Sequence, residues 1–337
     1  MRKILITAVL TILAIIAWFF YANYVNISKT KIETKNVEKK DMVKEEIKST
    51  KPKVYFTKNI TPENMVKLYN LVNENIEGKV AVKVHGGETN APYILPRELV
   101  KAVIDAIPNG ANIVETNVLY NSVRETTEGN LRTMVDNGWT FAPIDILDSE
   151  GIVMLPVPNG KWFKEIAMGK HIKNYDSLVV LTHFKGHAMG GFGGSLKNIA
   201  IGIASGKEGK KQLHELDGNL FGAKNERFME HMAESGKATQ TLFGKHITYM
   251  NVMNNMSVDC DCAGASAEKP TVPDIGILAS TDLLALDQAS IDMLYNLPKE
   301  VSEHLRERIE SRKGLHQLDA MEALDMGSRD YELVVIE

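Results

Sequence analysis

The pattern of hydrophobic and polar residues divides the chain into an apolar start, a polar stretch and a long region of alternating segments. Residues 4–25 form an unbroken uncharged run after Arg2 and Lys3. At about 1.5 Å per residue, a helix of this length crosses the hydrocarbon core of a bilayer. Aromatic residues crowd the far end of the run, as they do at membrane interfaces. The pattern therefore predicts a membrane-spanning helix over residues 1–25.

The flanks of this run decide how it is used. Ala22 has Phe20 two residues before it, so no small-x-small cleavage site follows, and we predict a retained signal anchor. The basic start favours a cytoplasmic N-terminus, whereas the lysines between residues 29 and 40 favour the opposite orientation. We expect a membrane-anchored protein whose domain lies on the extracytoplasmic face. Residues 26–53 are polar and predict a flexible tether.

From residue 54 to 337, short apolar segments alternate with amphipathic ones. β-Branched and apolar runs predict strands at 79–84, 111–114, 141–147, 175–182, 247–252, 275–279 and 331–336, with a hairpin around 153–162. Helical spacing predicts helices at 97–107, 131–137, 198–204, 225–243, 282–294 and 299–312. This alternation predicts one α/β domain over 54–337, with a mostly parallel sheet covered by helices on both faces.

Composition and charge exclude some functions and constrain others. The net charge of -4 and the sequence pI near 6.2 give no electrostatic case for nucleic acid as a partner. The chain has two cysteines, Cys260 and Cys262, separated by one residue. Cysteines at this spacing rarely reach good disulfide geometry, so we expect no disulfide from this pair.

The segment 182–198, THFKGHAMGGFGGSLKN, follows the most strand-like stretch and carries the strongest chemical signal. Ligands of open α/β sheets bind at the carboxyl ends of strands. Three side chains supply proton transfer and positive charge and are the candidate catalytic residues: His183, Lys185 and His187.

The glycines of this segment suggest a binding site for a small anionic ligand. They let backbone amides approach a ligand, and a following helix N-terminus favours an anion. The candidate cofactor-binding residues here are Gly190, Gly191, Gly193, Gly194 and Lys197. No Gly-Lys-Ser/Thr closes the run, and Leu196 replaces the third glycine of a dinucleotide fingerprint, so it matches neither motif. The alternative interpretation is a glycine-rich turn without a ligand.

Further candidates follow other strands. His85 and Glu88 come after the strand at 79–84, as acid/base groups or ligands, and the polar residues 115–121 follow the next strand. If the sheet is parallel, these strand ends line one cleft. The candidate metal ligands are Cys260, Cys262 and His214, since thiolates suit zinc, copper or iron. Four-cysteine spacing is absent, so an iron–sulfur cluster needs other ligands, and a structural loop is the alternative.

Several motifs resemble the domain-of-unknown-function 362 family, which is often labelled as iron–sulfur-centre proteins. They are VKVHGGE (82–88), VVLTHFKGHAMGGFGGSLKNIAIGIAS (179–205), MSVDCDC (256–262), VPDIGILASTDLLALDQASID (272–292) and GSRDYELV (327–334). The resemblance covers about residues 53–337. Members often carry a ferredoxin-like cysteine module, which the two cysteines here do not form.

A more distant similarity links the central run to the nickel-pincer lactate racemase family. That family has a His–Gly-rich–Lys run followed by a metal-binding histidine. His187 stands ten residues before Lys197, and His214 follows. The similarity implies that His187 is an acid/base, Lys197 a cofactor anchor and His214 a nickel ligand.

Three functional hypotheses follow. The first is an enzyme that acts on or with a small anionic ligand or cofactor through acid/base chemistry. The second is an iron–sulfur or other metal-binding redox protein that uses Cys260 and Cys262. The third is a surface-tethered binding protein without catalysis.

Overall fold

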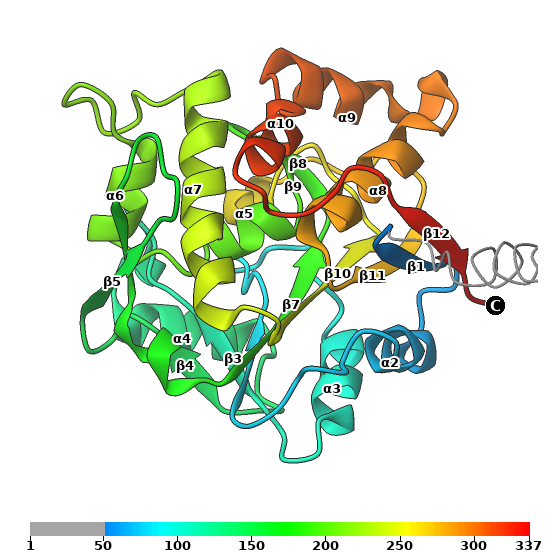
Figure 1. The fold of residues 1–337 in the computed structure, drawn as a ribbon, viewed down its shortest axis with the longest axis horizontal. Helices are drawn as coiled ribbons and strands as arrows, with labels where there is room; N and C mark the ends of the chain where they lie inside the picture. Colours follow the sequence, from blue (N-terminus) through cyan, green and yellow to red (C-terminus); the bar gives the residue numbers. More distant parts are fainter. Residues whose placement is uncertain (1–50) are drawn as a thin grey trace, which may run out of the picture. The chain divides into compact units, whose positions relative to one another are not determined.

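An eight-stranded sheet runs through residues 51–337, the part of the chain that the computed structural model describes (Figure 1). Its strand order is β12-β1-β11-β10-β7-β2-β3-β4. The bounds are β1 Lys53–Thr57, β2 Val80–Lys83, β3 Asn112–Glu115, β4 Ile144–Ile146, β7 Ser177–His183, β10 Ile247–Met253, β11 Gly276–Ser280 and β12 Glu332–Val335. The predicted membrane-spanning helix and most of the tether lie outside the described residues. Within residues 51–337, no helix combines the length and apolar character that crossing a membrane requires.

The predicted mostly parallel sheet is confirmed. β7 pairs in parallel with β10 on one side and β2 on the other, and β3 continues the parallel run to β4. β11 is the exception, because it runs antiparallel to both β1 and β10. Every residue of β7 is buried, as expected for a central parallel strand.

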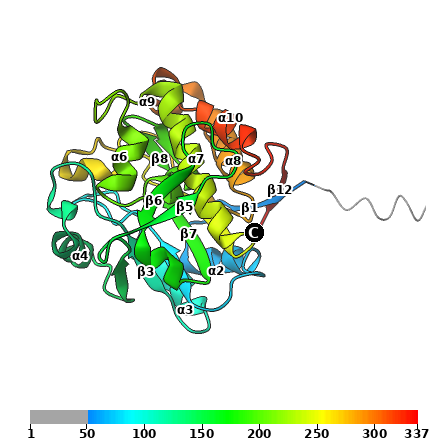
Figure 2. The same cartoon turned by 60° about the vertical axis from the view of Figure 1, so that its left-hand side comes forward.

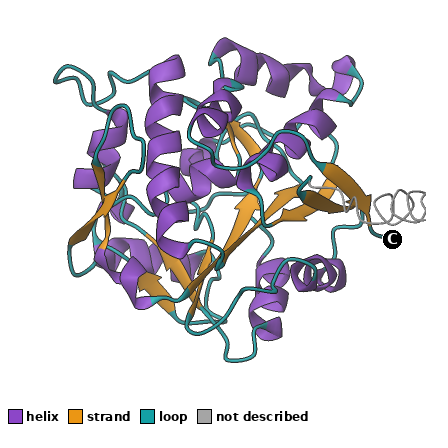
Figure 3. Ribbon diagram, viewed as in Figure 1, coloured by secondary structure: helices purple, strands orange, loops and turns teal. Residues whose placement is uncertain are grey.

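Helices cover both faces of the sheet (Figures 2 and 3). Leu178 and Val180 of β7 join the core beneath α5, α7 and α8, whereas Val179 and Leu181 join the core that contains α2 and α3. The helix bounds are α2 Pro62–Asn70, α3 Arg97–Ala106, α4 Thr127–Asp136, α5 Ser195–Ala200, α6 Glu208–His214, α7 Asn225–Phe243, α8 Leu283–Tyr295, α9 Lys299–Ser311 and α10 His316–Ala323. Short 3-10 turns are η1 Val123–Glu125, η2 Lys170–Asn174 and η3 Asp261–Ser266.

Two small hairpins stand apart from the main sheet. β5 (Ile152–Pro156) pairs with β6 (Glu165–Gly169), so the second strand of the predicted hairpin lies beyond its predicted bounds. β8 (Lys185–His187) pairs with β9 (Gly191–Gly193) inside the glycine-rich run. The run therefore follows the strand β7 and ends at the start of α5, as expected, with a hairpin between the two.

Candidate functional site

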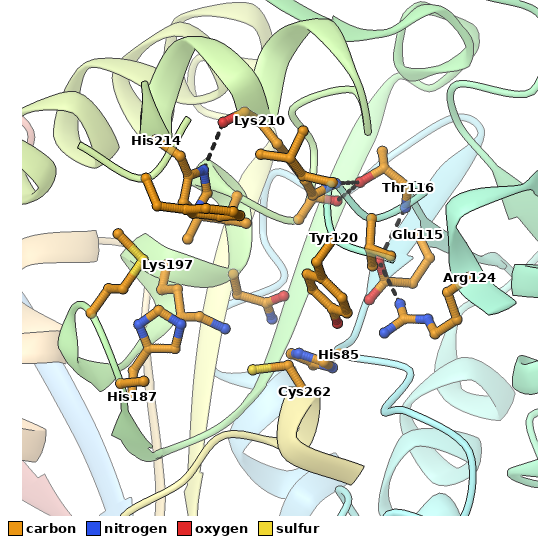
Figure 4. A pocket seen from close by; sticks show the side chains of 18 of the residues that line it. His85, Glu115, Thr116, Tyr120, Arg124, His187, Lys197, Lys210, His214 and Cys262 are labelled. Atoms are coloured by element: carbon orange, nitrogen blue, oxygen red, sulfur yellow. Dashed lines mark hydrogen bonds and ion pairs between the residues drawn. The ribbon is translucent and has the colours of Figure 1, made fainter. Parts of the chain in front are cut away.

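The loops after β2, β3 and β7 meet at one edge of the sheet around a cavity of about 230 Å³ (Figure 4). The wall also includes α5, α6 and the turn η3. The ionisable side chains in the wall are Lys83, His85, Glu115, Tyr120, Arg124, His187, Lys197, Lys210 and His214, and Cys262 also lines it. Five sequence candidates, far apart along the chain, thus share one cavity: His85, His187, Lys197, His214 and Cys262.

A smaller cavity adjoins this one. It shares His85 and Lys197 with the larger cavity, and its wall adds His183, Lys185 and the backbone of 193–194. Glu88 lies in neither lining, but its carboxylate accepts hydrogen bonds from Tyr120 and Ser122 and pairs with Arg124. Glu88 therefore supports the wall.

Among the described residues of the cavity wall, Lys197 is the cation without a counter-ion. Its side chain is only 8% exposed, and no residue of the described part forms a hydrogen bond or ion pair with its amine. Burial is the main cause that lowers the pKa of Lys197, and the charge of Lys185 lowers it further, to about 7.

The neighbouring cations Lys83, Arg124 and Lys210 all have hydrogen-bond or ion-pair partners within the protein. Lys83 donates 3.1 Å hydrogen bonds to Glu115 and Asn198 and a further one to the Val84 carbonyl. The second carboxylate oxygen of Glu115 lies 3.6 Å from the Arg124 guanidinium. The Lys210 amine donates to three oxygens: the Thr116 hydroxyl and the backbone carbonyls of Asn117 and Ala204. The cavity therefore holds one cation that is free to meet an anion.

Two imidazoles face this cation in the neutral form. Burial, followed by the charge of Lys197, holds the pKa of His85 and of His187 well below the ordinary value. Backbone N–H groups donate to their Nδ1 atoms, from Gly87 at 3.1 Å and from Gly190 at 2.8 Å. Each neutral ring therefore carries its proton on Nε2.

His214 has the opposite tautomer. Its Nδ1 donates to the Lys210 carbonyl at 2.6 Å, which leaves a lone pair on Nε2. Burial lowers the pKa of His214 to about 4, so the ring stays neutral near pH 7.

His183 and Lys185 are engaged within the protein. Both ring nitrogens of His183 face acceptors, Asp261 at 3.1 Å and the Asn254 carbonyl at 2.7 Å. Lys185 donates to Asp261 at 2.6 Å and to the His183 carbonyl. Burial raises the pKa of Asp261, but Lys185 and then His183 outweigh burial and bring it to about 2. These contacts hold the loop that carries the two cysteines.

The helix N-terminus behind the glycine-rich run already has an anionic partner within the protein. The amides of Ser195 and Leu196, at the start of α5, donate to the Asp287 carboxylate at 2.9 Å each. This carboxylate occupies the place predicted for a ligand. Gly190 and Gly191 form the β8–β9 turn and line neither cavity; Gln317 covers them by donating to the Gly190 carbonyl.

The expectation that Cys260 and Cys262 stay unpaired is also wrong. The structure joins them in a disulfide, with their Cα atoms 5.1 Å apart. The turn η3 starts directly after Cys260 and folds the chain back, so the two side chains meet. Cys262 lines the larger cavity, whereas Cys260 is 2% exposed.

Sequence reasoning missed several residues of the wall. Lys83, Arg124 and Lys210 were not among the candidates. A signal existed for Lys83, since a charged residue ends the otherwise apolar strand VAVK. Arg124 and Lys210 lie in segments without a motif, and only the fold brings them to Glu115 and Thr116.

A model of the family described as domain of unknown function (DUF362) matches residues 80–292. The chain belongs to this family. Every residue that lines the larger cavity falls within the matched range, so the cavity is part of the DUF362 domain. No curated protein matches the chain.

Two solved structures are similar to the DUF362 chain at low identity. A Thermotoga maritima protein shares 13% identity with a TM-score of 0.36, over 57% of this chain and 50% of that one. The lactate racemase apoprotein from Thermoanaerobacterium thermosaccharolyticum shares 13% identity with a TM-score of 0.39, over 71% of this chain and 56% of that one. The chain thus spans about half the length of these two structures.

Proposed function

We propose that this protein is an enzyme that binds a small anionic ligand or cofactor at Lys197 and moves a proton through the imidazoles beside it. The observation that carries the proposal is the buried Lys197 amine, which faces a cavity without a counter-ion. A bound anion would supply the missing partner.

The charges around the cavity support an anion rather than a cation. Glu115 is already shared between Lys83 and Arg124. The positive charge of Lys197 is therefore not balanced by the wall. Interactions of this kind are strong in a partly enclosed site because little water screens them.

The imidazoles support proton transfer. His85 and His187 present Nε2–H groups, and His214 presents an Nε2 lone pair, so donors and an acceptor line the same cavity. Lys197, whose pKa is about 7, is itself half protonated near neutral pH. We assign the proton transfer to His187, with His85 as its partner, and a positioning role to His183 and Lys185.

The two cofactors implied by the resemblances fit unequally. A cluster held by four cysteines does not fit, since the chain has two and they are bonded to each other. The residues that the racemase similarity singles out, His187, Lys197 and His214, all line the cavity, so a nickel-pincer group fits the donor set. Lys197 would hold its anionic part and His214 Nε2 its metal. Such a group would supply a metal centre beside the imidazoles.

Anion binding by the full-length protein tests the proposal. Sulfate or lactate is expected to raise the melting temperature of the wild-type protein. Neither anion should change the melting temperature of Lys197→Met. Lys211→Met is the matched control, because Lys211 lies on α6 with a side chain 58% exposed. Equal stabilisation of wild type and Lys197→Met would refute the proposed site.

A second measurement separates an enzyme from a binding protein. After incubation with the protein in D2O, lactate is recovered and examined for deuterium on the carbon next to its carboxylate. Deuterium that appears with wild type and disappears with His187→Gln supports proton transfer. Retained binding without deuterium in either protein favours a binding protein.

The N-terminal run supports a further part of this proposal. We propose that residues 1–25 anchor the enzyme in the membrane with the DUF362 domain on the extracytoplasmic face. Protease added to intact cells should then digest the domain. Protection of the domain until the cells are lysed would place it on the other side.

A further inference from the structure

Three metal-binding side chains meet beside the larger cavity, and two of them, His187 and Cys262, line it. One nitrogen of His187 and the sulfurs of Cys260 and Cys262 all lie within 4.8 Å of one another. We propose that, once the disulfide is reduced, these three groups bind one thiophilic divalent cation such as Zn²⁺, and that the disulfide closes this site. In this proposed site the histidine ligand is His187, whereas the sequence suggested His214 as the ligand beside the two cysteines.

The spacing suits a single ion. With Zn–S bonds of about 2.3 Å and Zn–N bonds of about 2.0 Å, ligand atoms of a tetrahedral zinc site lie about 3.5 to 3.8 Å apart. His187 is already within reach of both sulfurs. The two sulfurs must move apart, and cleavage of their bond allows this. His187 and Cys260 are each less than a tenth exposed, so the donors are held in place by packing.

The loop that carries the cysteines is fixed to β8 at two points. Before the pair, the Gly186 amide donates to the Ser257 carbonyl at 2.8 Å. Between the two cysteines, the Asp261 carboxylate accepts from Lys185 at 2.6 Å. Gly186 permits this close approach, since a Cβ there would lie 2.1 Å from the Val258 carbonyl oxygen. Reduction therefore opens the disulfide in a loop whose backbone remains anchored beside His187.

The fourth position of the ion would open into the cavity. Cys262 and His187 both line it, so a water molecule or an anionic ligand can complete the coordination there. Binding has one local cost: the Gly190 amide now donates to His187 Nδ1. Ligation through Nδ1 displaces this hydrogen bond, and ligation through Nε2 moves the proton to Nδ1.

The chemistry balances with a dithiol as the reductant. The dithiol gives two electrons and two protons to the disulfide, so that Cys260 and Cys262 become thiols and the dithiol becomes a cyclic disulfide. Zn²⁺ then displaces the two thiol protons and binds two thiolates. In the reverse direction a cyclic disulfide takes two electrons from the two thiolates and two protons from solvent and becomes the dithiol, while the Cys260–Cys262 bond forms again and the ion is released.

Native mass spectrometry of the full-length protein with added Zn²⁺ tests the site. Wild-type protein reduced with dithiothreitol and freed of reductant without oxygen is expected to bind one Zn²⁺ per chain. The oxidised protein and the reduced Cys260→Ser/Cys262→Ser double variant are expected to bind none. His187→Ala should bind at least tenfold more weakly than wild type.

Controls keep this proposal separate from the anion site. The exposed His304→Ala should bind Zn²⁺ as wild type does. Sulfate should no longer raise the melting temperature of Lys197→Met, but the reduced variant should still bind Zn²⁺. The double cysteine variant should still be stabilised by sulfate and should not bind Zn²⁺. Melting curves of the metal-free variants establish that they are folded. Equal Zn²⁺ binding by the oxidised and the reduced protein would overturn the proposed ligand set. Equal binding by His187→Ala and wild type would do the same, as would reduced wild-type protein that binds no Zn²⁺.

Discussion

Replacement of Lys197 with Met should stabilise the ligand-free protein, although it removes a charged side chain from the site. Met keeps much of the aliphatic stem and removes the unpaired buried charge. In the folded protein the pKa of Lys197 falls from its ordinary value of 10.5 to about 7. This difference corresponds to at most about 5 kcal/mol at low pH, and structural relaxation reduces the measurable part to roughly 1–3 kcal/mol.

The effect has a defined pH dependence. Below pH 7 the amine is charged in both the folded and the unfolded state, so the folded state carries the full penalty. Between about pH 7 and pH 10.5 the unfolded state binds more protons than the folded state, so wild-type stability rises with pH relative to the variant. The advantage of Lys197→Met should fall to about a third by pH 9.5 and vanish above pH 10.5.

Urea unfolding at pH 6 and pH 9.5 measures the advantage directly. Lys211→Met serves as the control, and its difference from wild type should be small at both pH values. A variant that is less stable than wild type at pH 6 would show that Lys197 already has a partner. A gain of equal size at both pH values would show that packing, rather than charge, is responsible.

Three further predictions concern the same region. Sulfate affinity should decrease as the pH rises through about 7, because Lys197 loses its proton; calorimetry showing a constant affinity to pH 9 would contradict this. Asp287→Asn should lower the free energy of unfolding by about 1–3 kcal/mol, because an amide replaces an acceptor of two buried N–H groups; an unchanged urea midpoint would count against that role. Gly186→Ala should destabilise the protein by about 1–3 kcal/mol through its clash with the cysteine loop and weaken Zn²⁺ binding; native binding would show that the loop yields freely.

The sequence predicts the elements with strong periodicity well. α7 has the predicted bounds 225–243, and β7 lies within two residues of its predicted start. Both carry many apolar residues at regular spacing, so local pattern and tertiary burial agree. The antiparallel direction of β11 was not predicted, because an apolar strand has the same composition in either direction.

The gathering of candidates at one sheet edge could be predicted from topology, but their bonding could not. His183, Lys185 and His187 are neighbours in sequence and look equivalent as proton carriers. In the fold, Asp261 engages the first two, while His187 faces the cavity. Asp261 lies 76 residues beyond Lys185. Such a partner is chosen by the tertiary structure, and no local signal marks it.

The unpaired state of Lys197 links stability to binding. An anion that pairs with the amine restores its pKa toward the ordinary value, so the free energy that destabilises the ligand-free protein becomes available to the complex. A protein that merely tolerated a buried lysine would gain stability from Lys197→Met without losing affinity for any anion. If the cavity is a binding site, Lys197→Met should differ from wild type in two quantities, a higher free energy of unfolding and a lower affinity for the anion. Both differences should diminish as the pH rises from 7 to 10, because both arise from the charge of the Lys197 amine.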